Sequence, residues 1–350
     1  MSNPIDLKTV KIFEPLKKRP EAFGHKEYSN LNSEMVYDIF SKNSNDTVTL
    51  WFKLQQAWCN NAYNTFKDYD SYLILVYLVN TVFQKYSDRF QFLSFEEFYA
   101  KNELVIDKIN LIEISKELNI PKETIRRKVN FLQNQNIIFR KGKSIYFSNA
   151  INKMQKPANS KKLMASFLEK SSEILSKESW FGRSFNKDEI ESFIDKYFTI
   201  CWQHWFRLQI PFLVRHRTFF GDLETWNVWG SIGISQYTDY SKQVKNRVVE
   251  ESSNYSDLYL GLLRHTPKNG INASSISEIS TIPRATVIRK LKYLLKQKLI
   301  VKNKKLEYML LPSPKNIKSF EENYTHNQKH KAGFVTTIFD LMKNSSFRIE

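Results

Sequence analysis

Apolar residues recur at helical spacing along most of this chain. The clearest case is residues 70–90, where apolar side chains from Tyr72 to Tyr86 share one helical face. A second apolar stripe runs from Ile190 to Leu208, and Pro211 is expected to end or kink that helix. We therefore predict a mostly α-helical fold with only small β elements. The helices predicted outside the repeat described below span residues 47–67, 70–90, 95–102, 163–177, 187–210, 256–265 and 334–342.

Three polar stretches interrupt this pattern. Residues 1–45 are polar, contain three prolines and are predicted to form an irregular arm. Residues 148–163 are rich in Ser, Asn and Lys and are the best candidate for a linker. The glycine-bearing segment 221–233 fits no element. The predicted organisation is an arm (1–45), a first half (46–150), a linker (151–165), a second half (166–312) and a polar tail with a short helix (313–350).

Two segments of the chain are copies of each other. At an offset of 162, residues 120–138 (IPKETIRRKVNFLQNQNII) and 282–300 (IPRATVIRKLKYLLKQKLI) are identical at eight positions. A repeat of this kind indicates that one structural unit occurs twice, in two pseudo-equivalent halves. The identical pairs are Ile120/Ile282, Pro121/Pro283, Thr124/Thr286, Arg127/Arg289, Lys128/Lys290, Leu132/Leu294, Gln135/Gln297 and Ile138/Ile300.

Each copy predicts a helix, a turn, a second helix and a hairpin. In the first copy, LIEISKELN suits a short helix, and Pro121 suits the start of the next one, whose buried face holds Ile125, Val129 and Leu132. Strands are predicted at 137–139 and 144–147, and in the second copy at 299–302 and 306–310. One departure concerns helix packing in the second copy. Polar Ser280 stands where the first copy has Leu118, with Ile279 one place earlier.

The positive charge is concentrated in this repeat. The chain has 350 residues and a formal net charge of +17. Residues 116–145 carry eight Lys or Arg against two Glu, and residues 282–305 carry nine and no acid. Biased codon usage would spread lysines evenly, so the localised charge indicates a polyanionic partner.

Both copies resemble the winged helix-turn-helix of bacterial transcriptional regulators, most closely the MarR-like type. The resemblance is carried by the two matched segments and the hairpin after each, within residues 105–148 and 256–311. It implies two winged helix-turn-helix units embedded in long scaffold helices, and a function in transcription regulation. The partner it implies is double-stranded DNA, bound by a monomer acting as a pseudo-dimer or by a homodimer.

DNA reading requires a slim helix with exposed donors for the major groove and cations that contact phosphate. Each second helix offers such donors near its start, and each hairpin offers lysines for phosphate or the minor groove. The predicted DNA-binding residues are Lys122, Thr124, Arg126, Arg127, Asn130, Lys141, Lys143, Arg284, Thr286, Arg289, Lys292, Lys302, Lys304 and Lys305. Because the helices differ at Glu123/Ala285, Arg126/Ile288 and Asn130/Lys292, the two half-sites are expected to be related but not identical.

The sequence gives little support for metal binding, redox chemistry or catalysis. Cys59 and Cys201 fit no metal or redox spacing. His326 and His330 have the spacing of metal ligands on a helix, but they lie in the polar tail and are interpreted as a chance pair. Trp202, Trp205, Trp226 and Trp229 could line a small-molecule pocket, but aromatic residues at this spacing are more often core or dimer interface, and a small-molecule effector stays open. With no signal peptide or catalytic motif, we expect a cytoplasmic protein that is not an enzyme and needs no cofactor. A plasmid-type replication initiator, a protein-interaction scaffold and an enzyme remain the alternatives.

Overall fold

The fold is mostly helical with a few short antiparallel strands, which confirms the predicted fold class at that level. The computed structural model describes residues 32–101, 104–106, 110–141, 144–147, 157–178, 183–245, 261–263 and 270–344. Lys143 and most of the helix predicted at 256–265 lie outside these ranges. Within them, no helix combines the length and apolar character that crossing a bilayer requires.

The two halves share one order of elements, to which the first half adds α4 and β1. The first half holds α1 (Ser33–Lys42), α2 (Ser44–Phe66), α3 (Tyr69–Asp88), α4 (Phe95–Ala100), β1 (Leu104–Ile106), α5 (Leu111–Leu118), α6 (Lys122–Asn134), β2 (Ile138–Lys141), β3 (Ser144–Phe147) and α8 (Ala158–Lys177). The second half holds α9 (Lys187–Lys196), α10 (Phe198–Phe220), α11 (Leu223–Lys245), α13 (Ala273–Ser280), α14 (Arg284–Lys296), β4 (Ile300–Lys302), β5 (Tyr308–Leu310) and α15 (Pro314–Asn344). We call β1 to β3 with α5 and α6 the first repeat unit. The second repeat unit is α13, α14, β4 and β5.

The duplication extends to the paired scaffold helices before each repeat unit. Helices α2 and α10 end at residues with positive φ, Lys67 (φ 51°) and Gly221 (φ 83°). Helix α3 then begins with Asp68, whose carboxylate accepts a hydrogen bond from the Ser71 backbone N–H. At the start of α11, Asp222 accepts one from the Thr225 N–H at 2.7 Å. The carboxylate of a capping aspartate accepts hydrogen bonds from free N–H groups at a helix start. The turns between α2 and α3 and between α10 and α11 are therefore stabilised in the same way.

The two repeat units have the same backbone geometry at each turn. Asn119 and Thr281, which are equivalent in the repeat, end the first helices with φ of 51° and 58°. The hydroxyls of Ser115 and Ser277 each donate to the carbonyl of the isoleucine before proline, at 2.6 Å in both units. A local sequence that recurs therefore produces the same local hydrogen bonds twice.

Small antiparallel sheets complete both units. In the first, the strand order is β1-β3-β2, with Phe147 of β3 opposite Leu104 on one side and Ile138 on the other. Strand β1 is absent from the sequence prediction. In the second, β4 pairs with β5, and Ile271 forms a single bridge to Tyr308 where a third strand would lie.

Ser280 occupies the same buried position as Leu118 rather than a shifted one. Both residues are fully buried. The Ser280 hydroxyl donates to the Ile276 carbonyl at 2.7 Å and accepts from the Ile282 N–H at 3.3 Å. The departure in sequence therefore leaves the helix register unchanged, because the hydroxyl finds partners within its own turn.

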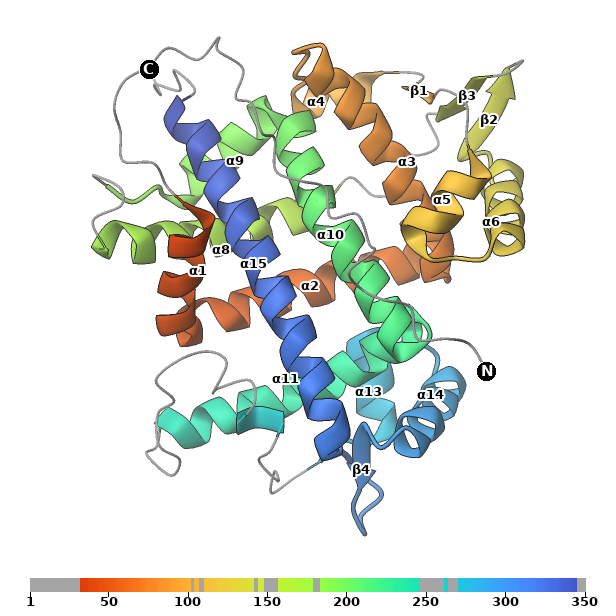
Figure 1. The fold of residues 1–350 in the computed structure, drawn as a ribbon, viewed down its shortest axis with the longest axis vertical. Coiled ribbons are helices and arrows are strands. Elements are labelled where there is room, and N and C mark those ends of the chain that lie inside the picture. The colour runs from red at the N-terminus through yellow and green to blue at the C-terminus, as the bar shows by residue number, and fades with distance from the viewer. Residues whose placement is uncertain are drawn as a thin grey trace.

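Helices of the two halves pack against each other, so the halves do not form separate domains. Helix α1 of the first half packs on α15 of the second, and α10 of the second half packs on α3 of the first. The buried hydrophobic residues form one connected cluster that reaches from Val36 to Met342. Both repeat units lie along one side of the molecule, with the hairpins toward opposite ends (Figure 1).

Several element predictions were wrong. The region predicted as a polar tail with a short helix is one long helix, α15, because its apolar face packs on α1 and α10. Helix α1 lies within the predicted arm, and α8 begins inside the predicted linker. The single helix predicted at 187–210 breaks at Tyr197, while Pro211 lies inside α10. The unassigned segment 221–233 falls in the turn after α10 and in α11.

The shared core predicts one unfolding transition. Leu132 and Leu294 are fully buried equivalents in the two units, so replacing either with Ala should lower the free energy of unfolding by about 2–5 kcal/mol. We expect each substitution to shift a single calorimetric transition. Two transitions, of which Leu132→Ala moves only one, would contradict the shared core.

Candidate nucleic-acid interface

The outer faces of α6 and α14 present the predicted basic residues to solvent. Arg127 and Arg289 occupy equivalent positions, and both are exposed. Thr124 and Thr286 are half-buried at the helix starts. Thr124, Arg127 and Asn130 border an open space between side chains on the outer face of α6. The predicted residues that the structure exposes are Lys122, Arg126, Arg127, Asn130, Lys141, Arg284, Arg289, Lys292, Lys302, Lys304 and Lys305.

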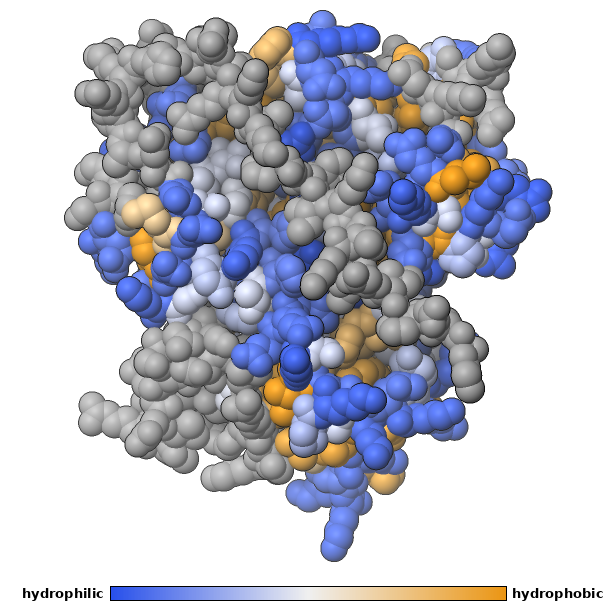
Figure 2. All heavy atoms as spheres, in the orientation of Figure 1, coloured by the Kyte–Doolittle hydropathy of each residue, from blue (hydrophilic) through white to orange (hydrophobic). Residues whose placement is uncertain are grey.

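The two surfaces are on the same side of the molecule. In the orientation of Figure 1, hydrophilic side chains cover much of the visible surface of both units and the end of the second hairpin (Figure 2). The hairpin that follows α14 carries Lys302, Lys304 and Lys305, all exposed. The folded chain therefore places on one side of the molecule cations that are about 160 residues apart in the sequence.

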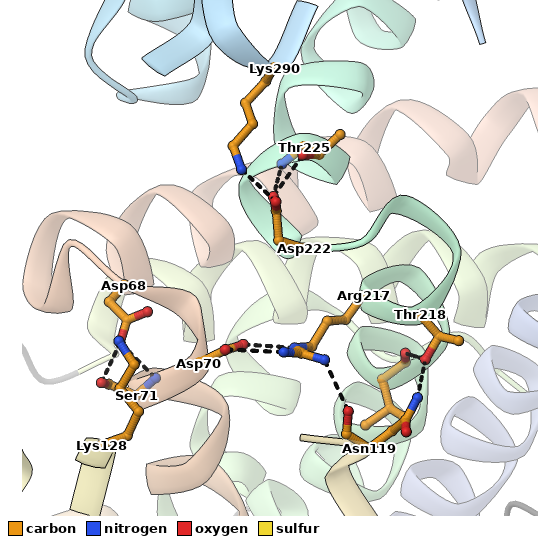
Figure 3. Close-up of polar contacts among 11 residues, drawn as sticks. Asp68, Asp70, Ser71, Asn119, Lys128, Arg217, Thr218, Asp222, Thr225 and Lys290 are labelled. Atoms are coloured by element: carbon orange, nitrogen blue, oxygen red, sulfur yellow. Dashed lines mark hydrogen bonds and ion pairs between the residues drawn. The ribbon is translucent and has the colours of Figure 1, made fainter. Parts of the chain in front are cut away.

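One basic residue in each helix points inward instead. Lys128 Nζ lies 2.7 Å from Asp68 Oδ2, and its equivalent Lys290 lies 2.5 Å from Asp222 Oδ2 (Figure 3). Each aspartate is also the cap of the scaffold helix beneath. A single carboxylate thus joins the start of α3 or α11 to the inner face of the basic helix above it.

These contacts set the protonation of both aspartates. Burial alone would raise the pKa of Asp68, but the hydrogen bonds from Lys128 and Ser71 outweigh it and hold the pKa below its usual value. Burial likewise opposes ionisation of Asp222, and Lys290 with Thr225 lowers its pKa. Both carboxylates are charged at neutral pH and accept from their lysines.

Each repeat unit is also held by a long helix of the other half. Arg217 on α10 forms a two-pronged ion pair with Asp70 and donates to the Asn119 carbonyl at 3.0 Å (Figure 3). The Asn119 amide donates to the Thr218 hydroxyl at 3.0 Å. Asn119 is the turn residue between α5 and α6, so α10 fixes that turn directly.

The reciprocal contact comes from α2. Asn60 donates to the Ile279 carbonyl at 2.8 Å, and Gln56 donates to the same carbonyl at 3.2 Å. Asn227 of α11 donates to the carbonyl of the next residue, Ser280, at 3.3 Å. Each turn that positions a basic helix is therefore held by a helix of the opposite half, α10 for the first turn and α2 for the second.

Some exposed cations are already engaged within their own unit. Arg126 forms an ion pair with Glu123 at 2.7 Å, and Arg284 donates to the Ser274 hydroxyl at 3.1 Å. In the hairpins, the Lys141 ammonium lies over the Phe139 ring at 5.2 Å. Lys302 has the same relation to Tyr308 at 5.6 Å. These contacts orient the side chains but are weak enough to exchange for an anionic ligand.

Glu224 lies close to both anchoring carboxylates at the start of α11. Burial is the main cause that raises its pKa, to about 7, and the charges of Asp222 and Asp68 add to this effect. Lys290 acts in the opposite direction. An ionised Glu224 would place a third negative charge at this point, so the folded protein retains its proton up to near-neutral pH.

Sequence reasoning missed the anchoring aspartates. The available signal was the spacing Asp-x-x-Ser at 68–71 and Asp-x-x-Thr at 222–225, typical of helix starts. That spacing does not predict the pairing of the aspartates with Lys128 and Lys290, because the lysines lie on other helices. All four of Trp202, Trp205, Trp226 and Trp229 are buried in the core, and Trp226 and Trp229 also line a cavity.

Three comparisons with known proteins found no match. No protein-family model, no curated protein and no solved structure matches it. In the described ranges, no cluster of three or more His, Cys, Asp or Glu side chains could hold a metal ion.

The inward ion pairs should contribute more than the outward one. In double-mutant cycles, we expect a coupling energy of about 1 kcal/mol between Lys290 and Asp222, measured with Lys290→Met and Asp222→Asn. The Arg126–Glu123 pair, whose side chains are 64% and 72% exposed, should give at most a few tenths of that. Equal coupling energies in urea unfolding would contradict the anchoring role.

Glu224 should make stability fall as the pH rises. An acid with a folded pKa near 7 and an ordinary value of 4.5 binds more protons when folded, so the free energy of unfolding decreases between those pH values. Glu224→Gln should therefore raise stability at pH 8 by roughly 1–3 kcal/mol and have little effect at pH 4.5. Glu278→Gln, at an exposed position on α13, is the matched control and should show no such pH dependence. A Glu224→Gln effect of equal size at both pH values would contradict the assignment.

Proposed function

We propose that this protein binds double-stranded DNA sequence-specifically, with α6 and α14 as recognition helices. The observation that carries the proposal is the repetition of one exposed cationic helix face on one side of a single rigid molecule. Basic helices on a protein surface are common, and one alone would be weak support. Here two basic helices occupy equivalent positions in the two repeat units, which hold most of the net charge. This arrangement favours a partner with regularly spaced phosphates.

The arrangement of each unit supports the resemblance to winged helix-turn-helix regulators of the MarR-like type. The order is helix, turn, helix and hairpin, with the three-stranded order β1-β3-β2 in the first unit. In such units the second helix enters the major groove and the hairpin contacts the backbone or the minor groove. Regulation of transcription is the use that we propose for this binding.

The exposed residues differ between the helices in a way that predicts unequal half-sites. In the first, Arg126 is paired with Glu123, so Arg127 and Asn130 are the readers that we assign; arginine favours guanine and asparagine favours adenine. In the second, Arg289 and Lys292 are exposed without a nearby acid on that helix face. The second half-site should therefore be richer in guanine.

The contacts that hold the two turns predict a fixed spacing. Because the units share one core, the two helices cannot adjust independently, and we expect half-sites one helical turn apart, about 34 Å. Inserting about half a turn of DNA between them should reduce binding to that of a single half-site.

One observation favours a second candidate, a protein-docking surface. Phe131 and Tyr293 are equivalent residues on the two helices, and each is 38% exposed. Exposed aromatic side chains are enriched at protein interfaces. Binding that has no salt dependence and no preference for DNA would favour this candidate, whereas repeated origin-like sites in a selection would favour a replication initiator.

Removing the equivalent arginines should weaken DNA binding. Duplexes selected from a random pool at two salt concentrations provide the target. On that target, Arg127→Ala/Arg289→Ala should lose about 30- to 20,000-fold in affinity, since each of the two arginine contacts contributes roughly 1–3 kcal/mol. If the arginines contact phosphate instead, the slope of log K against log salt should become shallower by about 1.8.

The matched control removes the same charge elsewhere. Lys162 and Lys177 are exposed on α8, which lies on the opposite side of the molecule from α6 and α14 (Figure 1). Lys162→Ala/Lys177→Ala should retain nearly full affinity. Equal losses in both double variants would mean that net charge alone attracts DNA, and unchanged affinity in the arginine variant would refute the proposal.

A further inference from the structure

A cavity of about 130 Å³ lies between helices of the two halves, and its lining includes no residue of α6 or α14. Its walls come from α2, α10, α11 and α15, with Leu262, Leu263 and Leu310 at one end. An apolar cavity of about 150 Å³ has room for a benzene ring. This one therefore has room for a molecule of about one ring.

Aromatic rings form much of the wall. Trp229 is stacked on Phe320, with ring centroids 4.9 Å apart and planes 13° apart. Trp226 contacts both His216, at 4.9 Å, and Phe212, at 5.4 Å. Flat walls of this kind favour a planar guest, because rings gain from stacked or edge-on contacts.

Buried polar groups on the wall have no partner. Gln55 is 6% exposed, and among the described residues neither its amide nitrogen nor its amide oxygen has a hydrogen bond. The indole N–H of Trp229, which is 8% exposed, is also unpaired there. An unsatisfied buried group costs about 1–3 kcal/mol. Both residues line the cavity, so a guest with a donor and an acceptor would remove these costs.

The lining excludes charged guests. None of the described residues on the wall is Asp, Glu, Lys or Arg. His216 is neutral, because burial lowers its pKa to about 3, and its Nδ1 must donate to the Phe212 carbonyl at 2.8 Å. Its Nε2 is then an acceptor. A charge in this cavity would have no counter-ion, which makes its burial costly.

We propose that this cavity is a binding site for an uncharged, planar, single-ring aromatic molecule bearing an amide-like edge. The donor of that edge faces the Gln55 oxygen, and its acceptor faces the Gln55 nitrogen or the Trp229 indole. The proposal does not depend on DNA binding, since none of these residues belongs to the basic helices.

Benzamide is a suitable probe, with benzoate and benzylamine as charged analogues of similar shape. Titration followed by tryptophan fluorescence and by calorimetry should give saturable binding of benzamide, with a rise in the unfolding temperature of the full chain. Benzoate and benzylamine should bind at least ten times more weakly. No saturable benzamide binding, which would mean a cavity filled by water alone, or equal binding of the three probes, overturns the proposal.

Three variants locate the site. Gln55→Leu should weaken benzamide binding about tenfold, while Gln209→Leu should leave it unchanged. Gln209 is a matched control because it is fully buried on α10 and also unpaired, but does not line the cavity. Gly230 does line it, and a Cβ there would meet no atom within 4 Å, so Gly230→Leu should fill the space and abolish binding without lowering the unfolding temperature. Unchanged benzamide affinity in both Gln55→Leu and Gly230→Leu would place the probe elsewhere and refute the site.

Discussion

Two lysine–aspartate pairs connect the surface of this protein to its scaffold. Lys128 and Lys290 point inward from otherwise exposed basic helices and meet Asp68 and Asp222. Because each aspartate also caps a scaffold helix, the position of the basic helix depends on where that scaffold helix begins. The pairs have partly exposed side chains, so their value is in geometry more than in stability.

The halves depend on each other for the same reason. Arg217 and Thr218 of the second half hold the turn at Asn119, and Asn60 of the first half holds the turn at Ile279. Two separately packed domains would let the basic surfaces move relative to each other. One connected core with reciprocal contacts gives them a single spacing, which the proposed binding to regularly spaced phosphates requires.

Two buried polar groups in this protein lower the free energy of unfolding. Glu224 is partly buried beside two ionised carboxylates, and Gln55 has an amide without a partner in the described part of the chain. Buried polar groups of this kind reduce stability unless something satisfies them. Below neutral pH, Glu224 keeps its proton and avoids the cost of a buried charge. The proposed ligand of the aromatic-walled cavity would form the hydrogen bonds that the Gln55 amide lacks.

Local sequence determined the elements and the repeat. The short helices, the turns before Pro121 and Pro283, and the exposed faces with Arg127 and Arg289 follow from spacing and residue type, since these signals act within a few residues. The hydroxyl contacts of Ser115 and Ser277 depend equally on nearby sequence.

Only the tertiary structure decided how distant segments meet. Long-range packing explains three features that the sequence did not predict. Lys128 pairs with Asp68, α15 is one long helix packed against α1, and the helix predicted at 187–210 is interrupted at Tyr197 rather than at Pro211. At that break, the Thr199 N–H donates to the Leu93 carbonyl, and the Thr199 hydroxyl accepts from the Leu93 N–H. Periodicity tells which face of a helix is buried, but it carries no information about the partner that buries it, because hydrophobic burial has no direction.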